Sequence, residues 1–345
     1  MRNLVFSIFI MILSTLPSWS QQDERDLEDL NIKKEDRPIK KITHRDDPRP
    51  KIAELQYEVL GTFSATSESD QFGASRADID KDRRIKIKLK FPLVLKSKLN
   101  IIGGIGYRNE RFSFDNIEET NYPIYQRLEN RSLKQVAAQI YLKKDLENQK
   151  FLFGYFANSL NSDEIQLDNF FNQLKTSLSV VMGKQRDEDT QIGFGISFGF
   201  DFGRPRIYPL FIYNKRLDYH WDVQLLLPKE AKLRYTISAK MHLLAKIGVS
   251  GTSYHLQDQP LEGFNKLEFR QSSIRFRLAL EREIYDWLWF GIKPGYNLPI
   301  NLFISEPKKS RKDSIINIDA EAAPFINLQL FAVVPKHLWK KAKGR

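Results

Sequence analysis

The chain has 345 residues, a formal net charge of +11 and no cysteine. A chain without cysteine has no disulfides, no thiolate metal sites and no lipidation at an N-terminal cysteine. After the first twenty residues no run of 18 apolar residues occurs, and the mean hydropathy is −0.44, which excludes a bundle of transmembrane helices. An exported protein can still cross a bilayer as a closed β-barrel, whose alternating strands keep the mean hydropathy low.

Residues 1–20, MRNLVFSIFIMILSTLPSWS, have the pattern of a secretory signal peptide. Arg2 precedes an apolar run, and Ser18 and Ser20 are suitably placed for cleavage after residue 20. An uncleaved membrane anchor is the alternative, but Pro17 and its polar neighbours interrupt the segment early. We therefore expect an exported protein of a Gram-negative cell.

Residues 21–52 predict a disordered, charged periplasmic segment. Residues 21–51 contain nine acids, nine bases, three prolines and few apolar residues. A docked helix, or a peptide that enters the barrel, is the alternative. The basic C-terminal tail, residues 335–345, carries +5, as much as all of residues 52–334. The net charge is therefore largely a property of the tail, and we expect no nucleic-acid partner.

From residue 53 to residue 334 an alternation of apolar and polar residues recurs, which is the period of a β-strand. The pattern predicts about fourteen strands, with twelve as the alternative count. The predicted strands are 55–65, 85–95, 99–113, 132–142, 150–158, 173–183, 190–203, 207–214, 219–227, 232–239, 241–254, 267–281, 286–296 and 324–334.

The stretch IGFGISFGFDFG, residues 192–203, shows the alternation most clearly. Large apolar residues occupy every other position, and the positions between them hold glycine, serine or aspartate. A helix would scatter the apolar residues around its axis, and each interior glycine would cost about 1 kcal/mol relative to alanine. In a strand, the small residues form one face, which suits a crowded or narrow interior, and the large residues form the other, which suits lipid.

The links between the predicted strands alternate in length. Tight links near 96–98, 143–149, 184–189, 214–218, 238–240 and 281–286 would lie at one end, and longer links near 66–82, 115–130, 159–172, 255–266 and 297–323 at the other. This is the layout of outer-membrane barrels, with short periplasmic turns. The links 204–206 and 228–231 are short exceptions on the long-link side. A soluble exported β-protein is the alternative, although fourteen strands would enclose more volume than the apolar residues could fill.

The alternation assigns candidate residues to the two faces of the barrel. The candidate lipid-facing residues are Ile85, Ile87, Leu89, Ile192, Phe194, Ile196, Phe198 and Phe200. The candidate lumen-lining residues are Lys86, Lys88, Lys90, Glu54, Glu58, Lys232, Arg234, Arg275 and Arg277. Rings of basic residues can favour anions in a pore. We expect instead that Glu54 and Glu58 pair across the first two strands with the lysines, which would leave the pore weakly selective.

Other motifs do not predict catalytic, metal-binding or cofactor-binding residues, and we expect no cofactor. His220 and Asp222 share a strand face and could orient a base, but no serine is placed beside them. The acids of DIDKD, residues 78–82, resemble a calcium loop, but Arg83 stands where an EF-hand needs glycine. KKSRK, residues 308–312, could contact the phosphates of outer-membrane glycolipid, with a solvated loop as the alternative.

The stretch PRIYPLFIYNKRLDYHWDVQLLLPKEAKLRY, followed by GTSYHL, resembles a family of uncharacterised outer-membrane β-barrel proteins of Bacteroidota-type bacteria. The matching residues are Pro205, Pro209, Leu227, Pro228, Tyr235, Gly251 and Tyr254. The resemblance covers roughly residues 53–334 and implies a fold and a location, because the family has no assigned activity. The chain departs from the pattern at its end, where a basic tail follows the last strand in place of a terminal aromatic assembly signal.

The sequence thus predicts an all-β transmembrane barrel over residues 53–334, in the outer membrane. The expected function is a passive or weakly selective pore or transport protein, and the sequence predicts no enzyme. A non-conducting structural or ligand-binding barrel is the first alternative, and a lipid-modifying barrel enzyme is the second. The expected partners are outer-membrane lipid and glycolipid, with peptidoglycan or periplasmic proteins at residues 21–51 and at the basic tail.

Overall fold

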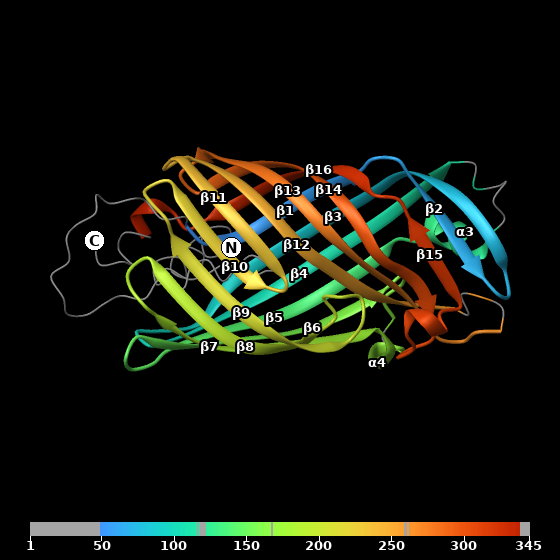
Figure 1. Cartoon of the computed structure of the whole chain (residues 1–345), viewed down its shortest axis with the longest axis horizontal. Helices are drawn as coiled ribbons and strands as arrows, with labels where there is room; N and C mark the ends of the chain where they lie inside the picture. Colours follow the sequence, from blue (N-terminus) through green and yellow to red (C-terminus); the bar gives the residue numbers. More distant parts are fainter. Residues whose placement is uncertain are drawn as a thin grey trace, which may run out of the picture.

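The computed structural model describes residues 49–115, 117, 122–166, 168–258, 261 and 263–338. The predicted signal peptide and most of the predicted charged segment lie outside the described residues. Within them the chain forms a closed antiparallel barrel of long, tilted strands (Figure 1). The sixteen strand segments are β1 (Lys51–Leu60), β2 (Phe63–Ser69), β3 (Gly73–Lys96), β4 (Leu99–Asp115), β5 (Leu133–Asp145), β6 (Lys150–Ser162), β7 (Leu174–Gln185), β8 (Thr190–Gly199), β9 (Arg206–Arg216), β10 (Trp221–Leu227), β11 (Glu230–Ser238), β12 (Met241–Leu256), β13 (Leu267–Tyr285), β14 (Leu288–Ser305), β15 (Ile316–Ala320) and β16 (Ala323–Val333).

These segments form fourteen barrel strands, because two strands are each interrupted once. β1 and β2 both pair with β3, and β15 and β16 both pair with β14. Each pair is therefore one strand with a break near its middle. β1 also pairs with β16, which closes the barrel. The predicted fold class and the count of fourteen are confirmed, and the alternative count of twelve is excluded.

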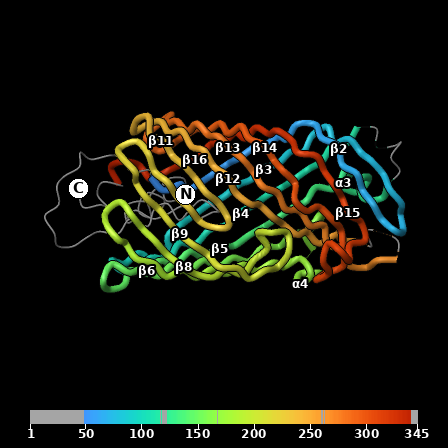
Figure 2. Tube along the Cα trace, in the orientation of Figure 1, coloured from blue at the N-terminus to red at the C-terminus, as the bar shows by residue number. Residues whose placement is uncertain are grey.

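Both ends of the described chain lie at the same end of the barrel, together with the tight turns (Figure 2). We call this the turn end and the opposite end the loop end. The predicted long links 66–82 and 297–323 are largely strand, since β2, the start of β3, the end of β14 and β15 occupy them. In residues 66–82 the mostly polar residues of β2 and of the start of β3 gave no apolar face to recognise.

The wall of the barrel is uneven, because the β10–β11 hairpin is short and ends about half-way along the barrel (Figure 1). β9 pairs with β10 only as far as Phe211, and β12 pairs with β11 only as far as Gly248. Beyond the hairpin tip, the edge of β12 contacts β6 instead. A parallel bridge joins Ser162 to His255, and the Asn161 Nδ2 donates to the Ser253 carbonyl at 3.1 Å. The wall therefore has a notch between β9 and the far half of β12.

Large apolar side chains point outward around the whole barrel. Phe194 is 64% exposed, and Ile85, Ile87, Leu89, Ile196 and Phe198 are also exposed, while Ile192 is half-buried. The prediction that Phe200 faces lipid is wrong. The strand β8 ends at Gly199 rather than at residue 203, and Phe200 lines an internal cavity. The alternation of the sequence continues past the point where hydrogen bonding to β9 ends, so the pattern could not reveal this turn.

The small face of β8 leaves room for large side chains inside the barrel. Gly193 pairs with Gly183 of β7, where an added Cβ would overlap the ring of Phe151. At Gly195 a Cβ would overlap the backbone of Val180 and Val181. Phe151, Val181, Leu210 and Ile212 are buried together inside this part of the wall. The glycines therefore match a crowded interior, as the sequence indicates.

Short helices lie among the links. α3 (Pro123–Asn130) follows β4, α4 (Phe170–Gln173) precedes β7, and the 3-10 turn η2 (Arg311–Asp313) precedes β15. Among the described residues no helix is long and apolar enough to cross a membrane. Part of the predicted basic tail is described. It begins by docking at the turn end, where the Lys336 Nζ lies 3.0 Å from a Glu283 oxygen.

Candidate functional site

A cavity of about 220 Å³ lies inside the barrel, near the height of the β10–β11 tip. We call it the central cavity. Residues from β1, β3 to β7, β9, β10, β12, β13 and β16 line it, together with Phe200, Asp201 and Lys229. Because so many strands contribute, the cavity lies within the lumen rather than in a surface fold.

One arc of the cavity wall is basic. Arg84, Lys86 and Lys88 project from β3, Arg108 from β4, and Arg275 and Arg277 from β13. With Lys175 and Lys229 the lining contains eight bases, against the two acids Glu58 and Asp201. The same alternation that turns Ile85 and Ile87 outward turns Arg84, Lys86 and Lys88 inward.

On the opposite side of the wall, an apolar and aromatic patch lies among polar residues, which include Gln139, Lys175 and Ser179. It is formed by Tyr141, Phe153, Tyr155, Val181, Leu210 and Leu226, from β5, β6, β7, β9 and β10. The rings of Tyr141 and Tyr155 lie 5.1 Å apart. The sequence analysis predicted a polar inner face, and this part of the inner face is different. It was missed because these residues alternate with equally apolar residues on the outer face.

A network of ion pairs covers the loop-end side of the central cavity. The Arg84 guanidinium contacts Asp82 at 2.5 Å, Glu110 at 3.0 Å and Glu58 at 3.4 Å. Glu110 also pairs with Arg108 at 2.7 Å, and Glu58 with Arg275 at 2.7 Å. The six groups are three guanidinium ions and three carboxylates, so their charges balance inside the lumen.

The structure places the predicted lumen-lining residues as follows. Glu58, Lys86, Lys88, Arg275 and Arg277 line the central cavity. The Lys90 ammonium lies 5.2 Å from the Tyr141 ring centre, on the same inner face.

The remaining three lie closer to the turn end and are buried. Glu54 is the register partner of Lys88 and accepts a hydrogen bond from the Gln56 amide. Lys232 and Arg234 lie on one face of β11, where Arg234 is 4.0 Å from Asp222. Glu58 is held by Arg84 and Arg275, so its ion pairs differ from the expected pairing with the lysines of residues 86–90.

Between the ion-pair network and the loop end, an apolar core packs inside the barrel around a smaller cavity of about 60 Å³, which shares Arg84, Arg108 and residues 250–252 with the central cavity. Inward-facing residues from β1 to β5 and from β12 to β16 pack around α3. The helix contributes Ile124, Tyr125 and Leu128. The Tyr125 hydroxyl donates to the Ala65 carbonyl at 3.0 Å and lies 2.6 Å from the Ser67 hydroxyl. Burial raises the pKa of Tyr125 to about 12, so the hydroxyl stays protonated at neutral pH.

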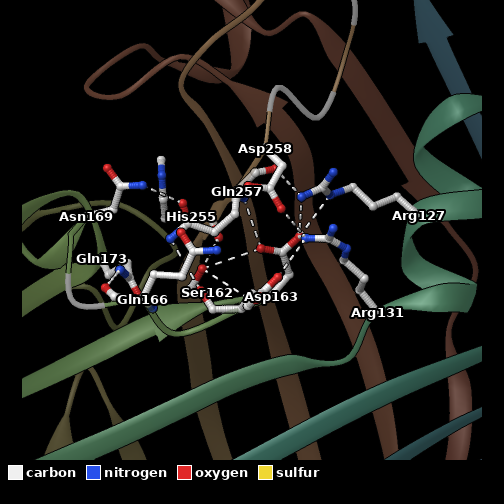
Figure 3. A network of polar contacts seen from close by, with 11 residues as sticks. Arg127, Arg131, Ser162, Asp163, Gln166, Asn169, Gln173, His255, Gln257 and Asp258 are labelled. Atoms are coloured by element: carbon white, nitrogen blue, oxygen red, sulfur yellow. Dashed lines mark hydrogen bonds and ion pairs between the residues drawn. The ribbon is translucent and has the colours of Figure 1, made fainter.

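A polar clasp fastens α3 to β6 and β12 at the loop end (Figure 3). The Arg127 guanidinium donates to Asp163 at 2.5 Å and 2.8 Å, and it also donates to the Gln257 carbonyl. Asp163 accepts a further hydrogen bond from the Gln257 N–H at 3.0 Å. Arg131 pairs with Glu164 and Asp258 nearer to solvent. The clasp holds the helix inside the barrel at the place where β6 and β12 meet.

The β8–β9 loop, residues 200–205, closes the notch in the wall. Phe200 and Asp201 line the central cavity, whereas Phe202 and Arg204 line a groove of about 660 Å³ at the loop end, with Phe303 and Arg311 among its other residues. The loop packs tightly on β12, because a Cβ on Gly251 would overlap the backbone of Asp201 and Gly203. Residues 200–205 therefore separate the central cavity from this groove.

An ion pair fixes the loop to the hairpin tip. The Lys229 ammonium lies 3.0 Å from an Asp201 carboxylate oxygen, and the Tyr208 hydroxyl donates to the same oxygen. The sequence analysis predicted neither Asp201 nor Lys229. The sequence did mark this region, because the links 204–206 and 228–231, which lie next to Asp201 and Lys229, are the short exceptions to the alternation of link lengths. Arg84, Arg108 and Glu110 were also missed, although Arg84 shares the alternation of Lys86 and Lys88.

The residues that the sequence analysis considered for a catalytic or a metal site have other partners in the structure. The His220 Nδ1 lies 2.8 Å from the Thr236 carbonyl, and Asp222 lies near Arg216 and Arg234. Asp82 points into the ion-pair network, whereas Asp80 pairs with Lys81. No group of three or more acids and histidines that could hold a metal occurs among the described residues. In the 308–312 segment, Arg311 pairs with Asp319 at 2.6 Å.

Residues 56–312 match the family model described as a domain of unknown function, DUF6268. The chain belongs to this family. The DUF6268 match covers most of the barrel. The family description assigns no activity and names no bacterial group. The predicted Bacteroidota-type origin therefore stays a prediction. None of the curated proteins matches the chain.

Several solved structures are similar to this DUF6268 barrel. An outer membrane channel from Pseudomonas putida F1 is 11% identical, with a TM-score of 0.42, covering 85% of this chain and 100% of the channel. The Pseudomonas putida toluene transporter TodX is 9% identical, with a TM-score of 0.35, covering 82% and 90%. The translocator domain of the autotransporter NalP from Neisseria meningitidis is 10% identical, with a TM-score of 0.31, covering 81% and 88%. At such scores neither substrate nor mechanism carries over from these proteins.

Proposed function

We propose that this chain is an outer-membrane transport barrel that moves small solutes between the periplasm and the cell exterior. In this proposal the turn end lies in the periplasm, and the solute passes the β8–β9 loop rather than the filled loop end. The observation that carries the proposal is the position of the central cavity, which reaches the loop in the wall, whereas ion pairs and an apolar core with a smaller cavity of about 60 Å³ lie between it and the loop end.

The outer surface supports insertion into a membrane. Exposed apolar residues occur on strands all around the barrel, and in water a surface of this extent would favour aggregation. In lipid the same side chains need no protein partner. The predicted secretory signal peptide and the tight turns near both ends of the described chain favour the outer membrane over other bilayers. Contacts of residues 308–312 with glycolipid, and of the charged segment and tail with peptidoglycan or periplasmic proteins, stay predictions.

The filled loop end favours a gated route over an open pore. The apolar core includes α3, which the clasp fastens at two positions to acidic residues. The notch is closed by residues 200–205 and one ion pair to the hairpin tip. Moving a short loop costs less than unpacking an apolar core, because fewer buried contacts are lost.

A reversible cross-link tests this route. The chain has no native cysteine, so the double variant Asp201→Cys and Lys229→Cys carries only the two introduced thiols. A short bis-methanethiosulfonate reagent would tie the loop to the hairpin tip, and a reductant would release it. We expect the efflux of benzenesulfonate from proteoliposomes to fall by about tenfold on cross-linking and to recover on reduction. Benzenesulfonate suits the assay because its permanent charge prevents it from crossing lipid unaided.

The matched control is the double variant Asp189→Cys and Arg216→Cys, whose native side chains form a similar ion pair at the turn end. Strands β8 and β9 already pair there, so cross-linking should leave the efflux unchanged. Efflux that is equally fast with the loop tied and released would overturn the proposed route. A folded barrel without benzenesulfonate efflux in either state would favour the non-conducting structural barrel, which the filled loop end also fits.

A further inference from the structure

We infer that Glu268 is a latch that holds the notch closed by joining β7 to β13 across it. The Lys175 ammonium, on β7, lies 2.6 Å from a Glu268 oxygen on β13. Five strands, β8 to β12, lie between β7 and β13 in the order of the sheet, so the two residues are not neighbours along the wall. They meet because β10 and β11 end below this height. The inference rests on the proposed function, because it names what keeps the transport route closed.

Glu268 lies on the outer face of the sheet and is nevertheless buried. It shares a strand face with Phe276, which is exposed on the outside of the barrel. Ser253 of β12 lies on this face too, is fully buried, and donates to Glu268 at 3.0 Å. The end of β7 and residues 200–205 cover this part of β12 and β13. The carboxylate is therefore kept from solvent by this cover.

The Glu268 carboxylate holds two cations together. Lys175 contacts its Oε1 atom, whereas the Arg270 guanidinium donates to its Oε2 atom at 2.6 Å and 2.8 Å. Among the described residues, no other carboxylate pairs with either cation. Arg270 is fixed on its own side of the notch, where it donates to the Lys309 carbonyl and lies 5.7 Å from the Phe303 ring centre. Without the carboxylate, the two buried cations would repel each other and push β7 away from β13.

The latch also holds the loop that closes the notch. The Lys175 ammonium lies 5.4 Å from the ring centre of Phe200, the first residue of the 200–205 loop. Both residues line the central cavity. The loop is therefore held at two places, by the ion pair to the hairpin tip and by Lys175 beneath it. Release of Lys175 from Glu268 frees the second place.

A buried reporter thiol in the full chain tests the latch. Ser272 of β13 is 4% exposed and lies beneath Gly203 of the loop, and the chain has no native cysteine. In lipid vesicles, we expect Glu268→Gln to raise the rate at which maleimide-poly(ethylene glycol) labels Ser272→Cys by at least about tenfold. The reagent is neutral, so the charge that the variant removes does not change its local concentration. An unchanged labelling rate would overturn the inference.

Glu281→Gln is the matched control. Glu281 lies on the same strand and is 7% exposed, against 6% for Glu268, but it pairs with Lys51 at 2.9 Å near the turn end. Its loss should leave the labelling rate unchanged. Folding of each variant is checked by its heat-dependent migration on a detergent gel. Equal acceleration by both variants would reflect a general loss of stability, and the latch would be wrong.

A double-mutant cycle distinguishes a latch from two separate contributions to stability. Lys175→Gln breaks the same contact across the notch, so it should accelerate labelling as well. Adding Glu268→Gln to it should then have little further effect, because the contact is already lost. Two effects that simply multiply would show that the residues act independently, which contradicts the inference.

Failure of the latch and failure of the proposed function give different results. Faster labelling in Glu268→Gln without faster benzenesulfonate efflux would support the latch and contradict a route through the notch. Efflux that responds to the cross-link between Asp201→Cys and Lys229→Cys, with labelling unchanged in Glu268→Gln, would support the route and overturn the latch.

Discussion

At the scale of single residues, the alternation of β8 shows how far a sequence can be interpreted. Phe194, Ile196 and Phe198 point outward, and Gly193 and Gly195 form the inner face, as the pattern indicates. The sequence could not reveal what the glycines accommodate. Phe151 occupies the space beside Gly183, but it lies on β6, and only the register between β6 and β7 brings the two together.

The outward position of Phe194 predicts that this side chain faces lipid rather than water. Phe194→Arg should destabilise the barrel in lipid vesicles by about 2–4 kcal/mol, because a charge would then lie in hydrocarbon. Phe171→Arg is the matched control, since Phe171 in α4 is 85% exposed and lies between strands at the loop end. Urea unfolding of the vesicle-inserted protein measures both. Equal stability of the two variants would mean that Phe194 faces water.

At the scale of elements, the strands were predictable and the contacts between distant links were not. Each predicted strand has a counterpart, because two-residue alternation depends only on neighbours in the chain. The core of the loop end depends on α3, whose link showed no such alternation. The notch in the wall follows from two short links, 204–206 and 228–231, which the sequence shows plainly. That the loop 200–205 packs across to Gly251 required the structure.

The contacts of the clasp predict that Arg127 keeps α3 folded in its place. Arg127→Gln leaves the Asp163 carboxylate, which is 1% exposed, with only the more distant Arg131 guanidinium at 3.8 Å, so we expect a cost near the lower end of the roughly 3–5 kcal/mol for breaking a buried pair. Amide hydrogen exchange in α3 should therefore become faster by more than about tenfold, while exchange in β3 and β4 stays slow because ladder hydrogen bonds hold these strands.

Arg131→Gln is the matched control for the clasp. Arg131 is about one-third exposed, lies 3.8 Å from Asp163 and pairs more closely with the exposed Glu164 and Asp258, so its loss leaves the Arg127–Asp163 pair intact and should change exchange in α3 little. If both variants left α3 equally protected, the apolar contacts of Ile124, Tyr125 and Leu128 alone would hold the helix, and the clasp would have no part in closing the loop end.

At the scale of the whole molecule, the sequence predicted the closed barrel and its fourteen strands but not the contents of its lumen. The predicted pore had a polar interior along its length. The structure has a central cavity with a basic arc on one side and an apolar patch among polar residues on the other, beneath balanced ion pairs and an apolar core. The apolar inner residues of β6 and β9, such as Phe153, Tyr155 and Leu210, were obscured because these strands also carry apolar residues on the outer face, so alternation alone could not separate lumen from lipid.

The transport route is tested most directly by comparing two reversible locks in one efflux assay. One lock joins Asp201→Cys to Lys229→Cys in the wall, and the other joins Arg127→Cys to Asp163→Cys in the clasp. The account predicts that benzenesulfonate efflux from proteoliposomes falls by about tenfold only when the wall lock is closed, and that reduction restores it. Efflux that stops with the clasp locked and continues with the wall locked would show that solutes leave through the loop end, and it would contradict the account.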